Sequence, residues 1–343
     1  MEKILEIKNL NTSFFTHVGE VKAVRNVSIT LEKGCALGIV GESGSGKSVT
    51  MLSIMKLLTE NGKLTKGQII FDKTDITNYN NKAMRNIRGN AISMIFQDPM
   101  TSLNPVLTIG KQMVEPIMHH KKLSKQEGKK IAIAMLKLVG ISSPETRLKQ
   151  YPHEFSGGMR QRVMIAIALS CNPKLIIADE PTTALDVTIQ AQILELFKDI
   201  RKKLNTSIIL ITHDLGIVAD LCDSVNVMYG GCIVERGSTR EIFYNAKHPY
   251  TWGLLNSVPN PKNLIREKLK PIDGQPPDLL DPPIGCPFAP RCDYAMEVCL
   301  NDMPEDFAIK EENSDSSIHS AACWLNHPDA PKIERPPRKE QPL

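Results

Sequence analysis

The sequence predicts an α/β fold in which buried strands alternate with helices, and three observations support this. Short apolar runs, Leu175–Ala178 and Ser207–Ile211, suit strands that are buried on both faces of a sheet. A glycine-rich segment, residues 41–48, separates another apolar run from a helical pattern. A helical insert at about 105–169 interrupts this α/β pattern, and a C-terminal region rich in proline and cysteine follows it.

The composition is that of a globular protein with a sizeable core. The chain has 343 residues, of which 41% are hydrophobic, and this excludes a wholly disordered protein. No stretch approaches the ~18 uninterrupted apolar residues of a membrane span, and the N-terminus lacks a signal-peptide pattern. We therefore expect a cytoplasmic chain that works at a membrane only by docking on another protein. The net charge of +4 is small and the longest basic run is Arg201–Lys203, so composition makes no case for nucleic acid.

The glycine-rich segment is predicted to bind phosphate. It has the sequence Gly41-Glu-Ser-Gly-Ser-Gly-Lys-Ser48 and directly follows the apolar run Ala36–Val40. Because glycine lacks a Cβ atom, successive backbone N–H groups can curl around a polyphosphate, while the lysine reaches its β- and γ-phosphates and the last serine ligates Mg²⁺. Apolar residues then recur at helical spacing, so that the positive end of a helix faces the anion: Met51, Ile54, Met55 and Leu58.

The strands before the insert follow a simple order. Residues 3–10 and 21–31 alternate as strands and predict an antiparallel platform ahead of the phosphate loop. Strand-like runs continue at Ile69–Phe71 and at Ala91–Phe96.

Helical signals dominate the insert, and the α/β pattern resumes after it. Ser124 and Glu127 form a capping box, and Gly140 ends the helix that this box begins. Gly230-Gly231 predicts a hairpin turn between two later strands. Between these signals, a helix after the Leu175–Ala178 strand is predicted from one apolar face: Ile193, Leu196, Phe197 and Ile200.

Polar residues that suit phosphate chemistry end three of the predicted strands. At the carboxyl end of the Leu175–Ala178 strand, Asp179 can hold Mg²⁺ and Glu180 can polarise the water that attacks a γ-phosphorus. His213 ends the next strand, where it can sense the γ-phosphate by donating a hydrogen bond. Gln97 closes the strand before the insert, and its amide can ligate Mg²⁺ or the attacking water.

A second anion-binding helix end is predicted within the insert. Ser156 is a natural N-cap, and Gly157 and Gly158 let backbone N–H groups approach an anion closely. Since one nucleotide does not need both helix ends, the simplest interpretation is that this one serves a nucleotide held by another subunit.

Residues 3–255 resemble an ATP-binding cassette (ABC) subunit. The motifs of that family occur in the family's order: Walker A at Gly41–Ser48, the Q-loop residue Gln97, the signature Ser156-Gly157-Gly158, Walker B at Leu175–Asp179, the general base Glu180, the D-loop Ala184-Leu-Asp186 and the switch residue His213. The resemblance implies a RecA-like P-loop ATPase core with an antiparallel β subdomain and an α-helical subdomain. It further implies that two such chains sandwich ATP head to tail.

The residues expected to bind ATP are carried over from this resemblance. They are Gly41, Glu42, Ser43, Gly44, Ser45, Gly46, Lys47, Ser48, Val49, Gln97, Asp179, Ser156, Gly157, Gly158 and Met159. Of these, Ser48, Gln97 and Asp179 are the expected Mg²⁺ ligands, and the expected catalytic residues are Glu180, His213 and Gln97.

Two positions depart from the family pattern. Met159 stands where glutamine commonly follows the signature, although the backbone donors there remain. The aromatic residue expected to stack on adenine falls on Thr16, with Phe15 or His17 as possible substitutes.

The C-terminal region resembles the extension of ATPases from dipeptide and oligopeptide importers. This likeness is carried by His248–Pro259 and by Gly285–Cys292. It predicts an ATPase domain at 1–258 with its helical subdomain at about 105–169, followed by a cysteine-containing extension at 259–343 that ends in a mobile tail.

The extension contains four cysteines without an obvious core around them. Cys286, Cys292, Cys299 and Cys323 are separated by five, six and 23 residues. Disulfides are disfavoured in a cytosolic chain, zinc usually has closer cysteine pairs, and wider spacing suits an iron–sulfur cluster. The resemblance to peptide-importer ATPases also implies a [4Fe–4S] cluster, with zinc and free structural thiols as the alternatives.

The expected function is ATP hydrolysis that powers import of di- or oligopeptides, with ATP and Mg²⁺ as cofactors. By resemblance, the partners are a second ABC ATPase, two permease subunits and an extracytoplasmic peptide-binding protein, so the chain is expected at the cytoplasmic face of the cell membrane. Nickel or another small solute is an alternative cargo. A soluble ABC-type factor is a further alternative, although such proteins usually have tandem cassettes or a long coiled-coil insert.

Overall fold

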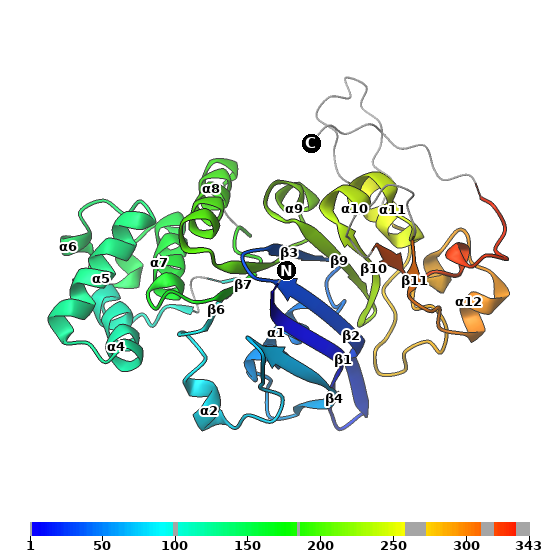
Figure 1. Ribbon diagram of the computed structural model, residues 1–343, viewed down its shortest axis with the longest axis horizontal. Helices are drawn as coiled ribbons and strands as arrows, with labels where there is room; N and C mark the ends of the chain where they lie inside the picture. The colour runs from blue at the N-terminus through cyan, green and yellow to red at the C-terminus, as the bar shows by residue number, and fades with distance from the viewer. Residues whose placement is uncertain (1, 99–101, 184–185, 258–271, 310–318, 334–343) are drawn as a thin grey trace, which may run out of the picture. The chain divides into compact units, whose positions relative to one another are not determined.

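The computed structural model describes residues 2–98, 102–183, 186–257, 272–309 and 319–333 (Figure 1). The chain forms two compact units, and each combines segments that are distant in sequence. Unit 1 comprises Met1–Leu5, Leu31–Ala36 and Phe71–Ile211, and unit 2 comprises Glu6–Thr30, Leu37–Ile70 and Thr212–Leu343.

Unit 1 is built on parallel strands. These are β6 (Ile92–Ile95), β7 (Leu175–Asp179) and β8 (Ser207–Ile211), with β7 between its two neighbours. Every residue of β7 and β8 is buried, as the unbroken apolar runs predicted. The remaining strand of this unit is the short β5 (Thr74–Asp75).

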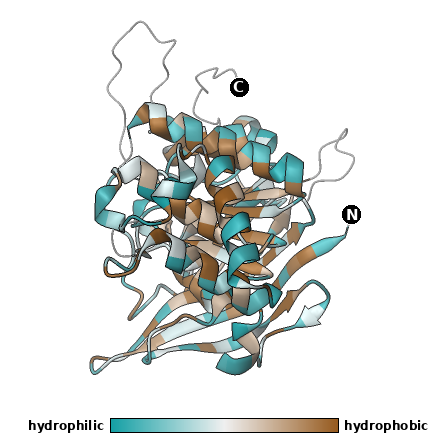
Figure 2. Cartoon of the chain, turned by 90° about the vertical axis from the view of Figure 1, so that its left-hand side faces the viewer, coloured by the Kyte–Doolittle hydropathy of each residue, from teal (hydrophilic) through white to brown (hydrophobic). Residues whose placement is uncertain are grey.

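Helices make up most of the regular secondary structure of unit 1. Their bounds are α2 (Asn81–Arg85), α4 (Ile109–Lys121), α5 (Lys125–Leu138), α6 (Pro144–Arg147), the 3₁₀ helix η1 (Pro152–Glu154), α7 (Gly157–Leu169) and α8 (Val187–Leu204). Helices α4, α5 and α7 pack on one another, and Figure 2 shows hydrophilic and hydrophobic residues alternating along the helices of this group. The capping box of Ser124 and Glu127 is confirmed at the start of α5, and the predicted apolar face of α8 is buried.

Most of the N-terminal platform belongs to unit 2. It contains β1 (Lys3–Phe15), β2 (Glu20–Glu32) and β4 (Gly62–Phe71), in the order β2-β1-β4. The predicted alternation is regular in the second half of β2, where Val27, Ile29 and Leu31 are buried. In β1 it is interrupted, because the neighbouring residues Ile4 and Leu5 are both buried.

A second sheet of unit 2 joins the phosphate loop to the C-terminal region. It contains β3 (Ala36–Val40), β9 (Ser224–Tyr229), β10 (Cys232–Ser238), β11 (Phe307–Ala308) and β12 (Ser320–Ala321), in the order β11-β12-β10-β9-β3. Strand β3 is parallel to β9, and the other pairs are antiparallel. The hairpin between β9 and β10 is confirmed, with Gly230 and Gly231 at φ 53° and 79°. The last two strands thus add a C-terminal edge to a sheet that begins at the phosphate loop.

The helices of unit 2 are short. They are α1 (Lys47–Met55), α9 (Leu215–Leu221), α10 (Thr239–Asn245), α11 (Pro249–Asn256) and α12 (Glu297–Asn301), with 3₁₀ helices η2 (Ala289–Arg291) and η3 (Trp324–Asn326). The apolar spacing after the phosphate loop predicted that α1 would include Leu58, and this is wrong. The helix ends at Met55 because Lys56 adopts a left-handed conformation with φ 49°. In the described part of the chain, no helix is both long and apolar enough to cross a membrane.

Two predicted features fall partly outside the described residues. The predicted domain boundary after residue 258 lies within 258–271, and most of the predicted tail lies within 334–343. Ala184 and Leu185 of the predicted D-loop also lie outside the described residues.

Candidate functional site

The phosphate loop has the strand–loop–helix context that its sequence predicts. Strand β3 ends at Val40 and helix α1 begins at Lys47, so residues 41–46 form the turn between them. A Cβ atom on Gly41 would lie 2.1 Å from the carbonyl oxygen of Met228. Gly41 and Gly46 also have φ values of 151° and 99°, which favour glycine. The loop therefore requires these glycines for close backbone approach and for left-handed conformations.

The lysine of this loop is held inside it. Lys47 is 7% exposed, and its Nζ donates hydrogen bonds of 2.8 Å to the carbonyl oxygens of both Gly41 and Glu42. On the next hairpin, the N–H of Gly231 donates to the carbonyl oxygen of Ser45 at 3.1 Å. The ammonium of Lys47 therefore lies against two loop carbonyls, and its residue begins helix α1. A cation beside the N-terminus of a helix suits the binding of an anion.

The remaining loop residues differ in exposure. Ser43 and Gly44 are exposed, Ser45 and Gly46 are buried, and Ser48 and Val49 at the start of α1 are half-buried. His213, also in unit 2, is exposed at the start of the segment that leads into α9.

In unit 1, the structure brings two predicted catalytic residues together. The Oε2 atom of Glu180 accepts a hydrogen bond of 2.7 Å from Nε2 of Gln97 and one of 2.9 Å from the Thr183 hydroxyl. Asp179, the last residue of β7, is 8% exposed. Residues 97 and 180 come from different strand ends, so their contact follows from the parallel pairing of β6 with β7.

The backbone at Glu180 is unusual for a residue with a long side chain. Its φ is 47°, and its N–H donates to the carbonyl oxygen of Ile211 at 2.9 Å. A left-handed conformation at a non-glycine residue costs about 1–3 kcal/mol and is typical of functional positions. Here it turns the chain sharply at the end of β7 and directs the carboxylate of Glu180 toward Gln97.

The signature segment forms a capped and accessible helix end in unit 1. The hydroxyl oxygen of Ser156 accepts a hydrogen bond from the N–H of Met159, which confirms Ser156 as the N-cap of α7. Gly157 is exposed with open space around the position of a Cβ atom, whereas a Cβ atom on Gly158 would lie 3.1 Å from Ile189. The first glycine leaves the helix end open to a ligand, and the second permits close packing against α8.

Four cysteines of the C-terminal region line one pocket in unit 2. Cys286, Cys292, Cys299 and Cys323 share this pocket with His248, Phe288 and Trp324, and all four are free thiols. Burial, with a smaller contribution from the nearby cysteines, raises the pKa values of Cys286 and Cys292 to about 11 and that of Cys323 to about 12. These three thiols are therefore protonated at neutral pH.

The described residues contain no preformed ion site that would support the predicted metal cluster at these cysteines. Across the residues that the structure describes, no group of three or more His, Cys, Asp or Glu side chains is arranged to hold a metal ion. The four thiols line one pocket. The donor set itself, four cysteines on one pocket, still matches the chemistry of a thiolate-bound cluster.

The sequence did not indicate two residues that contact the phosphate loop. The Tyr250 hydroxyl accepts a hydrogen bond of 2.8 Å from the N–H of Glu42, and the Arg291 guanidinium pairs with the Glu42 carboxylate at 2.7 Å. Both residues lie within the stretches that resemble peptide-importer ATPases, His248–Pro259 and Gly285–Cys292, but that resemblance says nothing about contact with the loop.

Comparisons with known proteins agree with this arrangement. Residues 24–183 match the ABC transporter family, and residues 234–299 match the oligopeptide/dipeptide transporter C-terminal region. The oligopeptide transport ATP-binding protein OppD of Bacillus subtilis is 56% identical over 97% of this chain and 92% of its own length. The dipeptide transport ATP-binding protein DppD of the same organism is also 56% identical, over 95% of each chain.

A solved structure shares the fold. The ATP-binding cassette MJ0796, solved as a dimer in a post-hydrolysis state bound to ADP and Pi, has a TM-score of 0.62 and 27% identity. The alignment covers 69% of this chain and 99% of that one. The fold is thus the mixed α/β fold of an ATP-binding cassette, and the chain belongs to the family of ABC transporter ATP-binding subunits of oligopeptide and dipeptide transporters.

Proposed function

We propose that this chain is the ATP-hydrolysing subunit that powers import of di- or oligopeptides by an ABC transporter. The observation that carries the proposal is the match of residues 234–299 to the oligopeptide/dipeptide transporter C-terminal region, because that region is additional to the general cassette. The relatives from Bacillus subtilis extend this similarity over almost the whole chain.

In the proposed reaction, the phosphate loop binds the triphosphate of ATP. Residues 41–49 supply backbone N–H groups, and Lys47 contacts the β- and γ-phosphates. Ser48, Gln97 and Asp179 are the proposed Mg²⁺ ligands. The position of Lys47 among the loop carbonyls supports this assignment, since a phosphate oxygen can replace those carbonyls as acceptor.

Glu180 is the proposed general base. Its carboxylate takes a proton from the attacking water, a bond forms between the water oxygen and the γ-phosphorus, and the bond to ADP breaks. Gln97 donates a hydrogen bond to that carboxylate and so orients it, while His213 donates to the γ-phosphate. The left-handed backbone at Glu180 supports a functional role for this residue.

The proposed assembly completes each ATP site from two chains. The Ser156–Met159 helix end of one ATPase contacts the nucleotide on Walker A of its partner, and the exposed Gly157 supports this use. The partners are a second ABC ATPase, two permease subunits and an extracytoplasmic peptide-binding protein. The chain would then act at the cytoplasmic face of the cell membrane, and a 1–258 ATPase domain followed by a 259–343 extension remains the proposed domain division.

The transport proposal is tested with the complete transporter. The chain is co-purified with its permease subunits and reconstituted in liposomes with the matching binding protein. We expect di- or oligopeptides to stimulate ATP hydrolysis and to accumulate in an ATP-dependent manner. Accumulation of nickel without any response to peptides would contradict peptide import, and co-purification with ribosomes instead of membranes would favour a soluble factor.

We further propose that Cys286, Cys292, Cys299 and Cys323 hold a [4Fe–4S] cluster, with zinc as the alternative. Such a cluster would cross-link segments of an extension whose described strands and helices are very short. The shared pocket and the four free thiols support this assignment.

Metal analysis of an anaerobic preparation tests the cysteine assignment. We expect iron and sulfide in the amounts of one cluster per chain, and we expect Cys323→Ser to lose most of that iron because one of four thiolates is missing. The matched control is Cys35→Ser, which alters a partly buried cysteine outside the pocket and should retain the iron. A colourless protein that carries stoichiometric zinc would contradict the cluster.

A further inference from the structure

Arg291 in the C-terminal region makes a partly buried ion pair with Glu42 of the phosphate loop. Its side chain is 6% exposed. Nη1 lies 2.7 Å from Oε2 of Glu42, and Nη2 lies 3.1 Å from Oε1, so that both carboxylate oxygens are engaged. The two residues are 249 positions apart in sequence, and both belong to unit 2. A bidentate ion pair of this kind fixes the orientation of the carboxylate as well as neutralising its charge.

The surroundings of Arg291 hold its guanidinium in one place. Nε and Nη2 donate to the carbonyl oxygens of Asp273 and Ile272 at 2.8 and 2.9 Å, and Nη1 also donates to the Tyr229 hydroxyl at 3.0 Å. The guanidinium lies 5.6 Å from the ring centre of Tyr229 and 5.9 Å from that of Phe288. Burial alone would lower the pKa of Arg291, but its bonds to Glu42 and Tyr229 outweigh burial and raise the pKa. Arg291 is therefore a permanent positive charge at a fixed position.

Glu42 is bonded on three sides within the same unit. Arg291 holds its carboxylate, the Tyr250 hydroxyl accepts from its N–H at 2.8 Å, and its carbonyl oxygen accepts from Nζ of Lys47 at 2.8 Å. Tyr250 is fully buried and its ring lies 4.6 Å from that of Tyr229. Glu42, which precedes the exposed turn of the phosphate loop, is thus bonded to α1, to α11 and to the C-terminal region.

A carboxylate at this loop position creates an electrostatic problem for a triphosphate. Glu42 is the second residue of the loop, and its negative charge would repel a ligand that carries several negative charges. Pairing with Arg291 neutralises that charge, and the bidentate geometry also keeps the carboxylate from rotating freely.

We propose that Arg291 is a positioning residue for ATP binding: it holds and neutralises Glu42 so that the phosphate loop accepts the triphosphate. The C-terminal region thereby acts directly on the ATP site of its own chain, besides any role in peptide transport. The inference rests on the proposed binding of ATP by residues 41–49. Because Arg291 acts through Glu42, its loss changes nucleotide affinity and leaves the catalytic step at saturating ATP in place.

The test is a double-substitution cycle in the full-length chain. Arg291→Met removes the charge while keeping a long side chain, and we expect the Kd and KM for Mg-ATP to rise about tenfold with kcat changed by less than about twofold. In a Glu42→Gln background the same substitution should raise the Kd by less than about twofold, because no charge is left to neutralise. Kd is measured by calorimetry with Mg-ATP.

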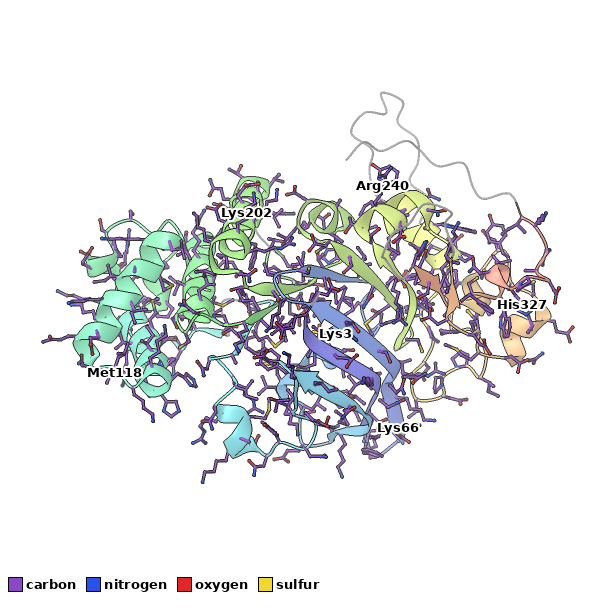
Figure 3. All side chains as sticks on the ribbon, in the orientation of Figure 1. Lys3, Lys66, Met118, Lys202, Arg240 and His327 are labelled. Carbon is purple, nitrogen blue, oxygen red and sulfur yellow. The ribbon has the colours of Figure 1, made fainter. Side chains whose placement is uncertain are left out.

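The matched control is Arg240→Met, which removes an exposed arginine from α10 (Figure 3). It should leave Kd and KM unchanged. Thermal unfolding of each variant identifies any general loss of folding.

Two results would overturn the inference. If Arg291→Met weakens binding equally in the original chain and in the Glu42→Gln background, the role of the arginine is merely structural, and an unchanged Kd in Arg291→Met also contradicts the proposal. Failure of the unsubstituted chain to bind Mg-ATP would instead refute the proposed function.

Discussion

Glu180→Gln is expected to reduce ATP hydrolysis by about 10²–10⁴-fold, because glutamine cannot take the proton from the attacking water. ATP binding should persist, since the phosphate loop is untouched. The variant is therefore expected to accumulate as an ATP-bound dimer, in which each nucleotide is held between Walker A of one chain and Ser156–Met159 of the other. Phosphate release measures the rate, and size-exclusion chromatography with Mg-ATP measures the dimer.

The control for this substitution removes a carboxylate from an exposed helix face. Glu195→Gln on α8 alters a side chain that is 72% exposed and pairs with Lys198, so hydrolysis should stay at the original rate. If Glu180→Gln also hydrolyses ATP at the original rate, Glu180 is not the base. Its hydrogen bonds from Gln97 and Thr183 would then serve only to hold the turn after β7.

Lys47→Ala is expected to weaken Mg-ATP binding about 100-fold. The ammonium of Lys47 is the one buried side-chain cation among residues 41–49. Loss of its two hydrogen bonds to the β- and γ-phosphates, at about 1.5 kcal/mol each, corresponds to this factor. Arginine should not restore binding, because its planar guanidinium does not fit the space between the carbonyl groups of Gly41 and Glu42. Calorimetry with Mg-ATP measures the change in affinity.

Lys202→Ala provides the matched control for Lys47→Ala. Lys202 is exposed on α8 (Figure 3), and its removal should leave the affinity for Mg-ATP unaltered. Near-normal affinity in Lys47→Ala would contradict the assignment of residues 41–49 as the phosphate-binding loop. That result would not contradict the cassette fold, because the similarity to MJ0796 does not depend on this side chain.

Local sequence signals predicted much of the fold correctly because each depends on neighbouring residues. The Ser124–Glu127 capping box and the Gly230-Gly231 turn both form where the sequence indicates. The extent of α1 was predicted less well, because apolar spacing alone does not reveal that Lys56 adopts a left-handed conformation and ends the helix. Helix ends depend on backbone geometry that periodicity does not encode.

The sequence by itself determined the chemical composition of the candidate site. Glycines, a lysine and acids stand at the ends of predicted strands because phosphate binding needs those residue types at those spacings, and this also identified the family. Only the tertiary structure decided which of them meet. Gln97 reaches Glu180 because β6 and β7 are parallel neighbours. Arg291 reaches Glu42 across 249 residues, and it also bonds to Tyr229 of β9, the strand that pairs with β3. Contacts between distant segments depend on strand order, which no local pattern in the chain specifies.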